Sequence, residues 1–371
     1  MADRLSRLLE LMRHQNLDAV AINPGATFSY LTGMRLHLME RPTMLLVAQS
    51  GAAALVLPQL EQLKLGSARM ALKPWLYADN PATWQEAFSA AFRELGLRNG
   101  RVGVEPRGMR YLELSFLQTA APECALVDGS AVFENLRLRK DQNELEKMQQ
   151  AAQIAQQALL ETLKTVRPGQ TEKQIAAELV IALFRAGSDI ELPFQPIVSS
   201  GENSANPHAV PGERELREGD LLLFDWGASL DGYFSDITRT FTVGKVDPEL
   251  ERIGPIVRDA NAAGRAAARP GLPASAVDIA ARGVITTAGF GEYFTHRTGH
   301  GLGMEAHEAP YIRDDNSQIL GPGMVFTVEP GIYLPGLGGV RIEDDMVISA
   351  EGAYSLTDLP RDVLPFENLR D

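Results

Sequence analysis

Three of the six histidines of this chain lie within twelve positions of one glycine-rich segment, HRTGHGLGMEAHEAP at residues 296–310. They are His296, His300 and His307. Neutral imidazole is a common metal ligand and a frequent proton carrier. The glycines between the histidines argue against a helix, so the segment does not present a helical histidine pair on one face. It predicts a loop whose histidines need partners from elsewhere in the chain.

Four acidic residues are the natural partners, because each lies at the end of an apolar run that reads as a buried strand. GDLLLFD, residues 219–225, and GMVFTVE, residues 323–329, each run from a glycine through five residues to a carboxylate. The first run enters a hairpin that turns at Asp231-Gly232, a strong turn signal. This turn brings Asp225 and Asp236 together on adjacent strands.

The second run, residues 323–329, also enters a hairpin. VFTVEPGIYLPGLGGVRIEDDMVI turns in its proline- and glycine-rich middle, which leaves Glu329 and Glu343 on the two arms. We expect all four carboxylates to converge from two halves of one sheet. Asp231 and Asp344, taken alone, are expected to be solvated hairpin residues.

Converging carboxylates cannot all stay ionised without compensating positive charge. Two divalent cations provide it most simply, with carboxylates bridging the ions and a histidine capping one of them. His300 is the candidate capping ligand because its flanking glycines allow close backbone approach. His307 and His208 are candidates to hydrogen-bond a substrate carbonyl. His296 either lies in the substrate pocket or supports the loop.

Two arginines lie close to the ligand candidates. Arg239 and Arg341 are either partners that orient the ligands or charges on a strand surface.

The elements around these residues are repeated. Residues 167–187 and 269–289 align without a gap, each beginning RPG and ending AG, and each precedes one of the two strand-and-carboxylate runs. Two copies of a helix–helix–strand unit predict a pseudo-twofold axis with the site between the halves. The amphipathic helix within 136–166 marks the start of this domain, at residues 136–371, after an α/β domain at residues 1–135.

Composition excludes several classes of protein. With 35 basic and 48 acidic residues, the net charge of −13 and the lack of a basic stripe argue against a nucleic-acid partner. No apolar run is long enough to span a membrane. The single cysteine, Cys124, excludes an internal disulfide framework and is typical of the cytoplasm.

The segments FDWGASLDGYFSDITRTFTVG, HRTGHGLGMEAHEAP, VFTVEPGIY and GVRIEDDMVI resemble the metallopeptidases of the pita-bread fold over residues 138–365. The preceding domain resembles the creatinase, prolidase and aminopeptidase P branch. The resemblance implies an α+β fold and two Mn²⁺, Co²⁺ or Zn²⁺ ions that activate a shared water. Five ligands are carried over from it, namely Asp225, Asp236, His300, Glu329 and Glu343. It also implies that Glu329 shuttles the proton, that His208, His307 and His296 bind the substrate, and that Tyr333 and Arg341 line or brace the site.

The resemblance leaves the substrate length open. Prolidases cleave Xaa-Pro dipeptides, whereas aminopeptidases P release the first residue of longer Xaa-Pro peptides. Archaeal-type prolidases resemble HEWPR where this chain has HEAPY, which places Tyr311 at the position of an arginine that can pair with a carboxylate. Arg313, Arg35 or Arg41 substitutes for that arginine, or longer peptides are preferred.

We predict an Xaa-Pro dipeptidase, with aminopeptidase P as the alternative. A creatinase-like hydrolase or a non-catalytic binding module is disfavoured, because all five ligand positions are kept. The substrate is a proline-containing dipeptide or short peptide, and relatives of this branch suggest a homodimer.

Overall fold

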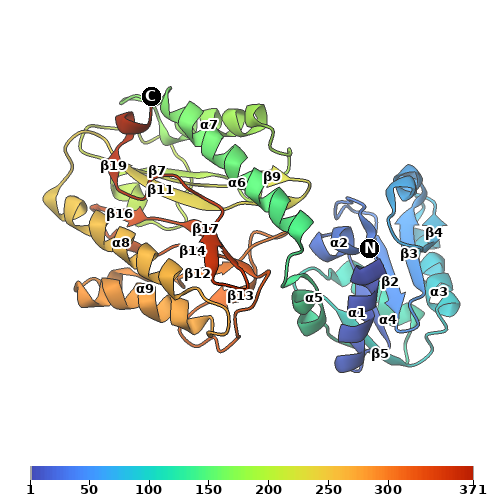
Figure 1. Ribbon diagram of the computed structural model, residues 1–371. Coiled ribbons are helices and arrows are strands. Elements are labelled where there is room, and N and C mark those ends of the chain that lie inside the picture. Colours follow the sequence, from blue (N-terminus) through green and yellow to red (C-terminus); the bar gives the residue numbers. More distant parts are fainter. Residues whose placement is uncertain (1, 371) are drawn as a thin grey trace. The chain divides into compact units, whose positions relative to one another are not determined.

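The computed structural model describes residues 2–370, which form two compact units that divide between Arg137 and Leu138. Figure 1 shows the smaller unit from blue to teal and the larger one from green to red. None of the helices in the described part of the chain is long and apolar enough to cross a membrane.

The smaller unit is an α/β domain. Its described residues form one six-stranded sheet in the order β4-β3-β2-β1-β5-β6, in which β1 pairs antiparallel with β2 and parallel with β5. The strands are β1 Ala19–Ile22, β2 Met44–Ala48, β3 Ala53–Pro58, β4 Lys73–Tyr77, β5 Gly100–Val104 and β6 Cys124–Asp128. The helices are α1 Ala2–His14, α2 Ala26–Thr32, α3 Trp84–Glu94, α4 Tyr111–Ala120 and α5 Ser130–Arg137. Strands β1, β2 and β3 are buried throughout, as expected for a sheet covered on both faces.

The larger unit contains two helix pairs. They are α6 Gln142–Leu163 with α7 Glu172–Ala186, and α8 Pro248–Ala267 with α9 Ser275–Thr287. The members of each pair pack against one another, α7 contacts β7, and α8 contacts β14 and β16. Figure 1 shows the strands of this unit between the two pairs. The helix–helix–strand repeat predicted from the sequence is therefore present twice.

Local signals explain where these elements begin and turn. The Thr171 hydroxyl accepts a hydrogen bond from the Gln174 backbone N–H, and the Gln174 side-chain oxygen accepts one from the Thr171 backbone N–H, which completes the predicted capping box of α7. The predicted turn at Asp231-Gly232 is also confirmed, since both residues have positive φ and they join the paired strands β9 Ser229–Leu230 and β10 Tyr233–Phe234.

The expectation of one continuous sheet was wrong. Two main sheets lie within the described residues of the larger unit, with the orders β19-β11-β8-β7 and β13-β12-β14-β17-β18. A single isolated bridge, Thr238 with Glu343, joins them. Beside it, the side chain of Arg239 donates to the Glu343 carbonyl at 2.6 Å, and Thr240 Oγ1 donates to the Arg341 carbonyl at 2.9 Å. Side chains thus occupy carbonyls that a continuous ladder would use.

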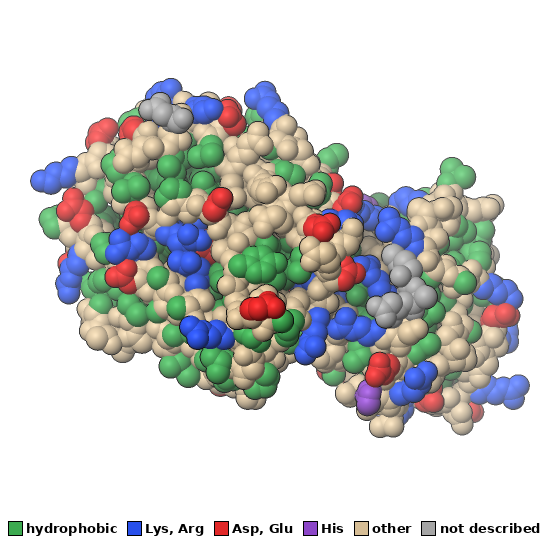
Figure 2. Space-filling model, in the orientation of Figure 1, with side chains coloured by type: hydrophobic (Ala, Val, Ile, Leu, Met, Phe, Trp, Pro, Cys, Tyr) green, Lys and Arg blue, Asp and Glu red, His purple; other side chains and the backbone are tan. Residues whose placement is uncertain are grey.

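The strands of the first main sheet are β7 Ile197–Ser200, β8 Leu221–Trp226, β11 Ile237–Thr242 and β19 Leu364–Pro365. Those of the second are β12 Gly299–Gly301, β13 Glu308–Ile312, β14 Val325–Val328, β17 Asp344–Ile348 and β18 Ala353–Ser355. A separate hairpin consists of β15 Gly331–Leu334 and β16 Gly338–Arg341. On the face shown in Figure 2, acidic and basic side chains of the larger unit are interspersed with uncharged ones, as is typical of a solvated surface.

Candidate active site

A cavity of about 630 Å³ lies within the larger unit and gathers most of the residues singled out from the sequence. Its size suits a small peptide, since ligand pockets usually span roughly 300–1,000 Å³. Polar residues dominate one part of its lining: His208, Asp225, Asp236, His296, Arg297, His300, His307, Arg313, Glu329, Arg341 and Glu343. Phe194, Gln195, Ile197, Pro207 and Ala306 complete the lining, and nothing in the sequence pattern had indicated them.

The two sheets deliver the four carboxylates to one place. Asp225 lies in β8 opposite Thr238 of β11, and Asp236 immediately precedes β11. Glu329 directly follows β14 and Glu343 directly precedes β17, at the end where Val328 pairs with Asp344. Because Thr238 also bridges to Glu343, the ends of the two hairpins meet.

The donor set fits divalent metal ions. Ligand atoms of Asp236, His300 and Glu343 all lie within 4.8 Å of one another, and all three residues are buried. His300 Nε2 is 3.3 Å from Glu329 Oε1. The carboxylate oxygens Asp225 Oδ1 and Asp236 Oδ1 are buried and have no hydrogen-bond partner among the described residues. Buried carboxylate oxygens are rarely left unsatisfied, so these atoms suit a bound cation.

The pKa shifts of the buried carboxyls and of His300 also favour bound cations. Burial raises the pKa of Asp236 and of Glu343 well above their usual values, and neighbouring carboxylates raise them further. Burial also raises the pKa of Glu329 to about 7, against the opposing charge of Arg341. Burial lowers the pKa of His300 well below its usual value, which keeps its imidazole neutral. Added positive charge would oppose the rise in the pKa of the carboxyls and keep the carboxylates ionised.

Arg341 is buried and orients the site directly. Its Nη2 donates to Asp225 Oδ2 at 2.5 Å, and its Nη1 donates to the Tyr333 hydroxyl at 2.9 Å. The Tyr333 hydroxyl lies 2.7 Å from His296 Nε2. The alternative of a strand-surface charge is excluded for Arg341, which is 3% exposed. Tyr333 thus joins Arg341 to His296 from a buried position behind the cavity lining.

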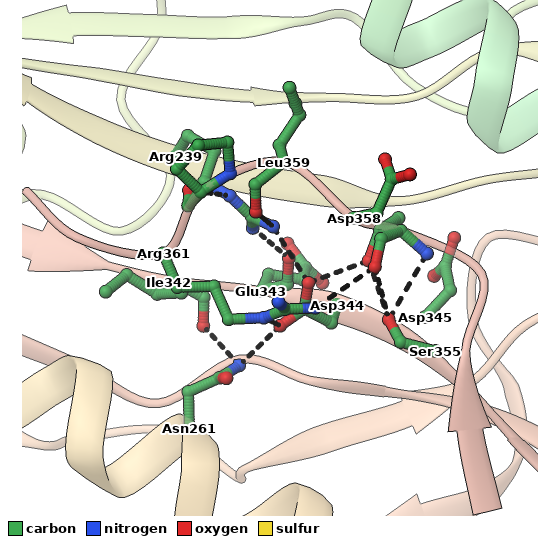
Figure 3. Close-up of polar contacts among 12 residues, drawn as sticks. Arg239, Asn261, Ile342, Glu343, Asp344, Asp345, Ser355, Asp358, Leu359 and Arg361 are labelled. Atoms are coloured by element: carbon green, nitrogen blue, oxygen red, sulfur yellow. Dashed lines mark hydrogen bonds and ion pairs between the residues drawn. The ribbon is translucent and has the colours of Figure 1, made fainter.

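Arg239 is also buried, and it pairs with Asp344, next in sequence to Glu343. Figure 3 shows Asp344 surrounded by donors from segments far apart in the sequence. They are Arg239 Nη2 at 2.8 Å, Arg361 Nε at 2.8 Å, Thr357 Oγ1 at 2.7 Å and Asn261 Nδ2 at 3.0 Å. The expectation that Asp344 is solvated was wrong, because residues of β11, of α8 and of the segment after β18 cover it. Asp231, by contrast, is exposed as expected.

The histidines take different places in the cavity. A side chain at Gly299 would overlap the Thr327 carbonyl and one at Gly301 the Ala309 carbonyl, so the backbone on either side of His300 approaches its neighbours as only glycine allows. The His307 ring lies 4.0 Å from the His300 ring, centroid to centroid. His307 and His208 are exposed and line the cavity. Burial, aided by Arg341, lowers the pKa of His296 to about 4, so its ring is neutral.

Tyr311 and Arg313, at the end of the HEAPY segment and just after it, differ in whether they line the cavity. Arg313 lines the cavity, whereas Tyr311 is not among the described residues that line it. The ring of Tyr311 instead makes a cation–π contact with the guanidinium of Arg297, whose Cζ is 4.8 Å from the ring centroid. Sequence reasoning missed Arg297, although it lies between His296 and the predicted ligand His300. Only its position in the HRTGHG segment could have indicated it.

Comparison with known proteins gives consistent matches. The model of metallopeptidase family M24 matches residues 146–350, and the creatinase/prolidase N-terminal domain matches residues 4–139. The chain is 34% identical over 362 residues to a putative dipeptidase, YkvY, of Bacillus subtilis (strain 168), covering 98% of this chain and 99% of the relative. A solved dipeptidase from Pyrococcus horikoshii OT3 is 40% identical with a TM-score of 0.91, covering 98% of this chain and 99% of that one. A solved prolidase from Thermococcus sibiricus is 33% identical with a TM-score of 0.93, covering 98% of each chain.

Proposed function

This chain belongs to metallopeptidase family M24, with a creatinase/prolidase N-terminal domain and a pita-bread catalytic unit, and from that premise we propose that it is an Xaa-Pro dipeptidase. One observation supports the proposal most strongly. A single cavity is lined by all five expected ligand residues together with three further histidines. A creatinase-like or purely binding role would not need this complete donor set.

We propose that Asp225, Asp236, His300, Glu329 and Glu343 hold two divalent cations. Four carboxylates and one imidazole suit Mn²⁺, although Co²⁺ and Zn²⁺ accept the same donors. When bound, such ions lower the pKa of a water molecule and polarise the scissile carbonyl. The unpartnered oxygens of Asp225 and Asp236 support this assignment.

The protein side chains supply the proton transfer. Glu329 is positioned to accept a proton from the attacking water and to deliver it to the proline nitrogen as the peptide bond breaks. Glu329 lines the cavity, and its Oε1 lies 3.3 Å from Nε2 of the candidate ligand His300, so its carboxylate faces the place where the ions and their water would bind.

The histidines bind the substrate. His208 and His307 project into the cavity and can donate to the carbonyl oxygen as negative charge develops on it. Neutral His296, held by Tyr333, lines the cavity beside them.

The decisive experiment compares Ala-Pro, Ala-Ala and Ala-Pro-Ala with protein that has been stripped by a chelator and reloaded with Mn²⁺, Co²⁺ or Zn²⁺. We expect only reloaded protein to act, and to release proline from Ala-Pro much faster than it acts on the other peptides. Faster cleavage of Ala-Pro-Ala would favour the aminopeptidase P alternative. Full activity of stripped protein would refute metal dependence.

A homodimer in the cytoplasm is the assembly that we propose. The single cysteine supports a reducing compartment, and the resemblance to this branch supports the dimer. Light scattering on the purified full chain tests the oligomeric state.

A further inference from the structure

Three arginines line the cavity among the described residues, and two of them are already engaged. Arg341 is buried and bonded to Asp225 and Tyr333. Arg313 has a side chain that is 57% exposed, and its Nε lies 2.7 Å from Asp315 Oδ1. A new anion in the cavity would have to compete with those carboxylates for either of these arginines.

Arg297 is different. No carboxylate within the described part of the chain lies at ion-pair distance from its half-buried side chain, and its guanidinium lies over the ring of Tyr311. An aromatic ring occupies only a face of a guanidinium, which leaves the N–H groups along its edge able to take a carboxylate in bidentate fashion. Arg297 is therefore the cavity arginine that is best prepared for an incoming anion.

The backbone around Arg297 is held firmly. Buried Asp278 accepts hydrogen bonds from the Thr298 backbone at 3.0 Å and the Thr298 hydroxyl at 2.7 Å. Asp278 also pairs with Arg282, which donates to the His296 carbonyl at 2.8 Å. The residues on both sides of Arg297 are thus fixed to α9, so the arginine is presented from a rigid segment.

The position of Arg297 also suits a group close to the reaction. Its charge opposes the burial that raises the pKa of Glu329, which places it within electrostatic reach of the proton carrier. In a dipeptide only three bonds separate the scissile carbonyl carbon from the terminal carboxylate carbon, a span of roughly 3–4 Å. In a longer peptide a neutral amide takes the place of that carboxylate.

We propose that Arg297, braced by Tyr311, binds the free carboxylate of the dipeptide and thereby restricts the site to dipeptides. The inference rests on the proposed function. It assigns substrate-length selection to the HRTGHG segment of the catalytic unit, and it gives Tyr311 a positioning role.

The test compares Ala-Pro with its C-terminal amide, which differs only by the loss of the negative charge. For the unsubstituted protein we expect kcat/KM to favour Ala-Pro by roughly 100-fold, the usual worth of a charge-assisted pair. In Arg297→Gln this ratio should fall to about 1, mainly through KM for Ala-Pro. Arg313→Gln should keep the ratio. A ratio that survives Arg297→Gln, or that collapses in Arg313→Gln instead, would overturn the inference.

Tyr311 provides a second check. Tyr311→Phe keeps the aromatic face and should keep the ratio, whereas Tyr311→Ala should lower it. Equal ratios in the two variants would remove Tyr311 from the explanation and contradict the proposed bracing.

Binding separates this inference from the proposed function. Calorimetry with L-proline and L-prolinamide reports carboxylate recognition without turnover. A protein that does not hydrolyse Ala-Pro, but loses its preference for proline in Arg297→Gln, would refute the dipeptidase assignment and support the carboxylate site. Equal binding of proline by both proteins would refute the carboxylate site.

Discussion

Replacing Asp344 by asparagine is expected to lower the free energy of unfolding of the larger unit by about 4 kcal/mol, because the substitution leaves buried arginines without their anion. Asp344 is 0% exposed, and its two oxygens accept from Arg239, Arg361, Thr357 and Asn261. Asparagine keeps the shape but has one carbonyl oxygen, so its amide nitrogen would face donors. With an m-value of about 3 kcal/mol/M, the urea midpoint should fall by roughly 1.3 M.

The pH dependence of this loss follows from the charge. Burial by itself would raise the pKa of Asp344, but Arg239 and Arg361, with the Thr357 hydroxyl, hold it below its usual range. A carboxyl whose pKa is lowered on folding stabilises the fold above its unfolded pKa of about 3.9, and this stabilisation is lost as the pH falls below that value. The difference between Asp344→Asn and the unsubstituted protein should therefore be constant near neutrality and shrink below about pH 4.

The assay needs a signal from the larger unit alone. Of the three tryptophans, Trp226 is in the larger unit and fully buried, whereas Trp75 and Trp84 are in the smaller unit. Trp75 and Trp84 are therefore changed to phenylalanine. Tryptophan fluorescence during urea unfolding then reports only the unfolding of the larger unit. Exposed Asp358 is the matched control, and Asp358→Asn should cost under about 0.5 kcal/mol. A loss below about 1 kcal/mol for Asp344→Asn, or one independent of pH, would refute the reasoning.

Four further outcomes are expected. Chelation should abolish hydrolysis and lower the melting temperature, since a ligand in hundredfold excess over Kd stabilises by about 2.7 kcal/mol; an unchanged melting temperature would argue against a metal site. Asp236→Ala should lose at least one ion by elemental analysis, whereas Asp231→Ala, at an exposed turn, should lose none. Metal affinity should rise between pH 6 and pH 8, because burial raises the pKa of Glu329 to about 7 and its carboxyl must release its proton to coordinate. Calorimetry in two buffers of different ionisation enthalpy measures that proton release. Lys140→Met should cost about 3–5 kcal/mol by removing the buried cation that pairs with Glu308, and adding Glu308→Gln should recover part of the loss, so strictly additive losses would disprove the coupling.

The sequence could predict the elements that bring the carboxylates together, because their signals are local. The pattern of a glycine, an apolar strand and a terminal acid occurs twice in the chain. The Asp231-Gly232 turn sets the register that places Asp225 near Asp236. The predicted fold class is confirmed by the solved relatives. The roles predicted for the individual ligands stay predictions, and Asp236→Ala tests one of them.

Contacts between distant segments could not be predicted in this way. Lys140 meets Glu308 across 168 positions, and Arg239 reaches the Glu343 carbonyl across 104. Neither spacing follows from a helical or strand period. The break between the two sheets has the same origin, since it depends on which side chains reach the carbonyls of the opposite strand.

The three consecutive acids of the GVRIEDDMVI segment show why residue type alone does not assign a role. Alternate side chains of a strand point to opposite faces, so Asp344 faces away from the side shared by Glu343 and Asp345. Glu343 lines the cavity and accepts from the Thr238 hydroxyl at 2.6 Å, while Asp344 is neutralised by arginines. Asp345 accepts the backbone N–H of Asp236 at 3.1 Å, and burial raises its pKa well above the usual value. One strand therefore supplies a candidate metal ligand, an anion for the structural arginines, and an acceptor that fixes the backbone of a second ligand from the other hairpin. Moving the register by one residue would exchange these faces, so the register of β17 against β14 determines which acid reaches the cavity.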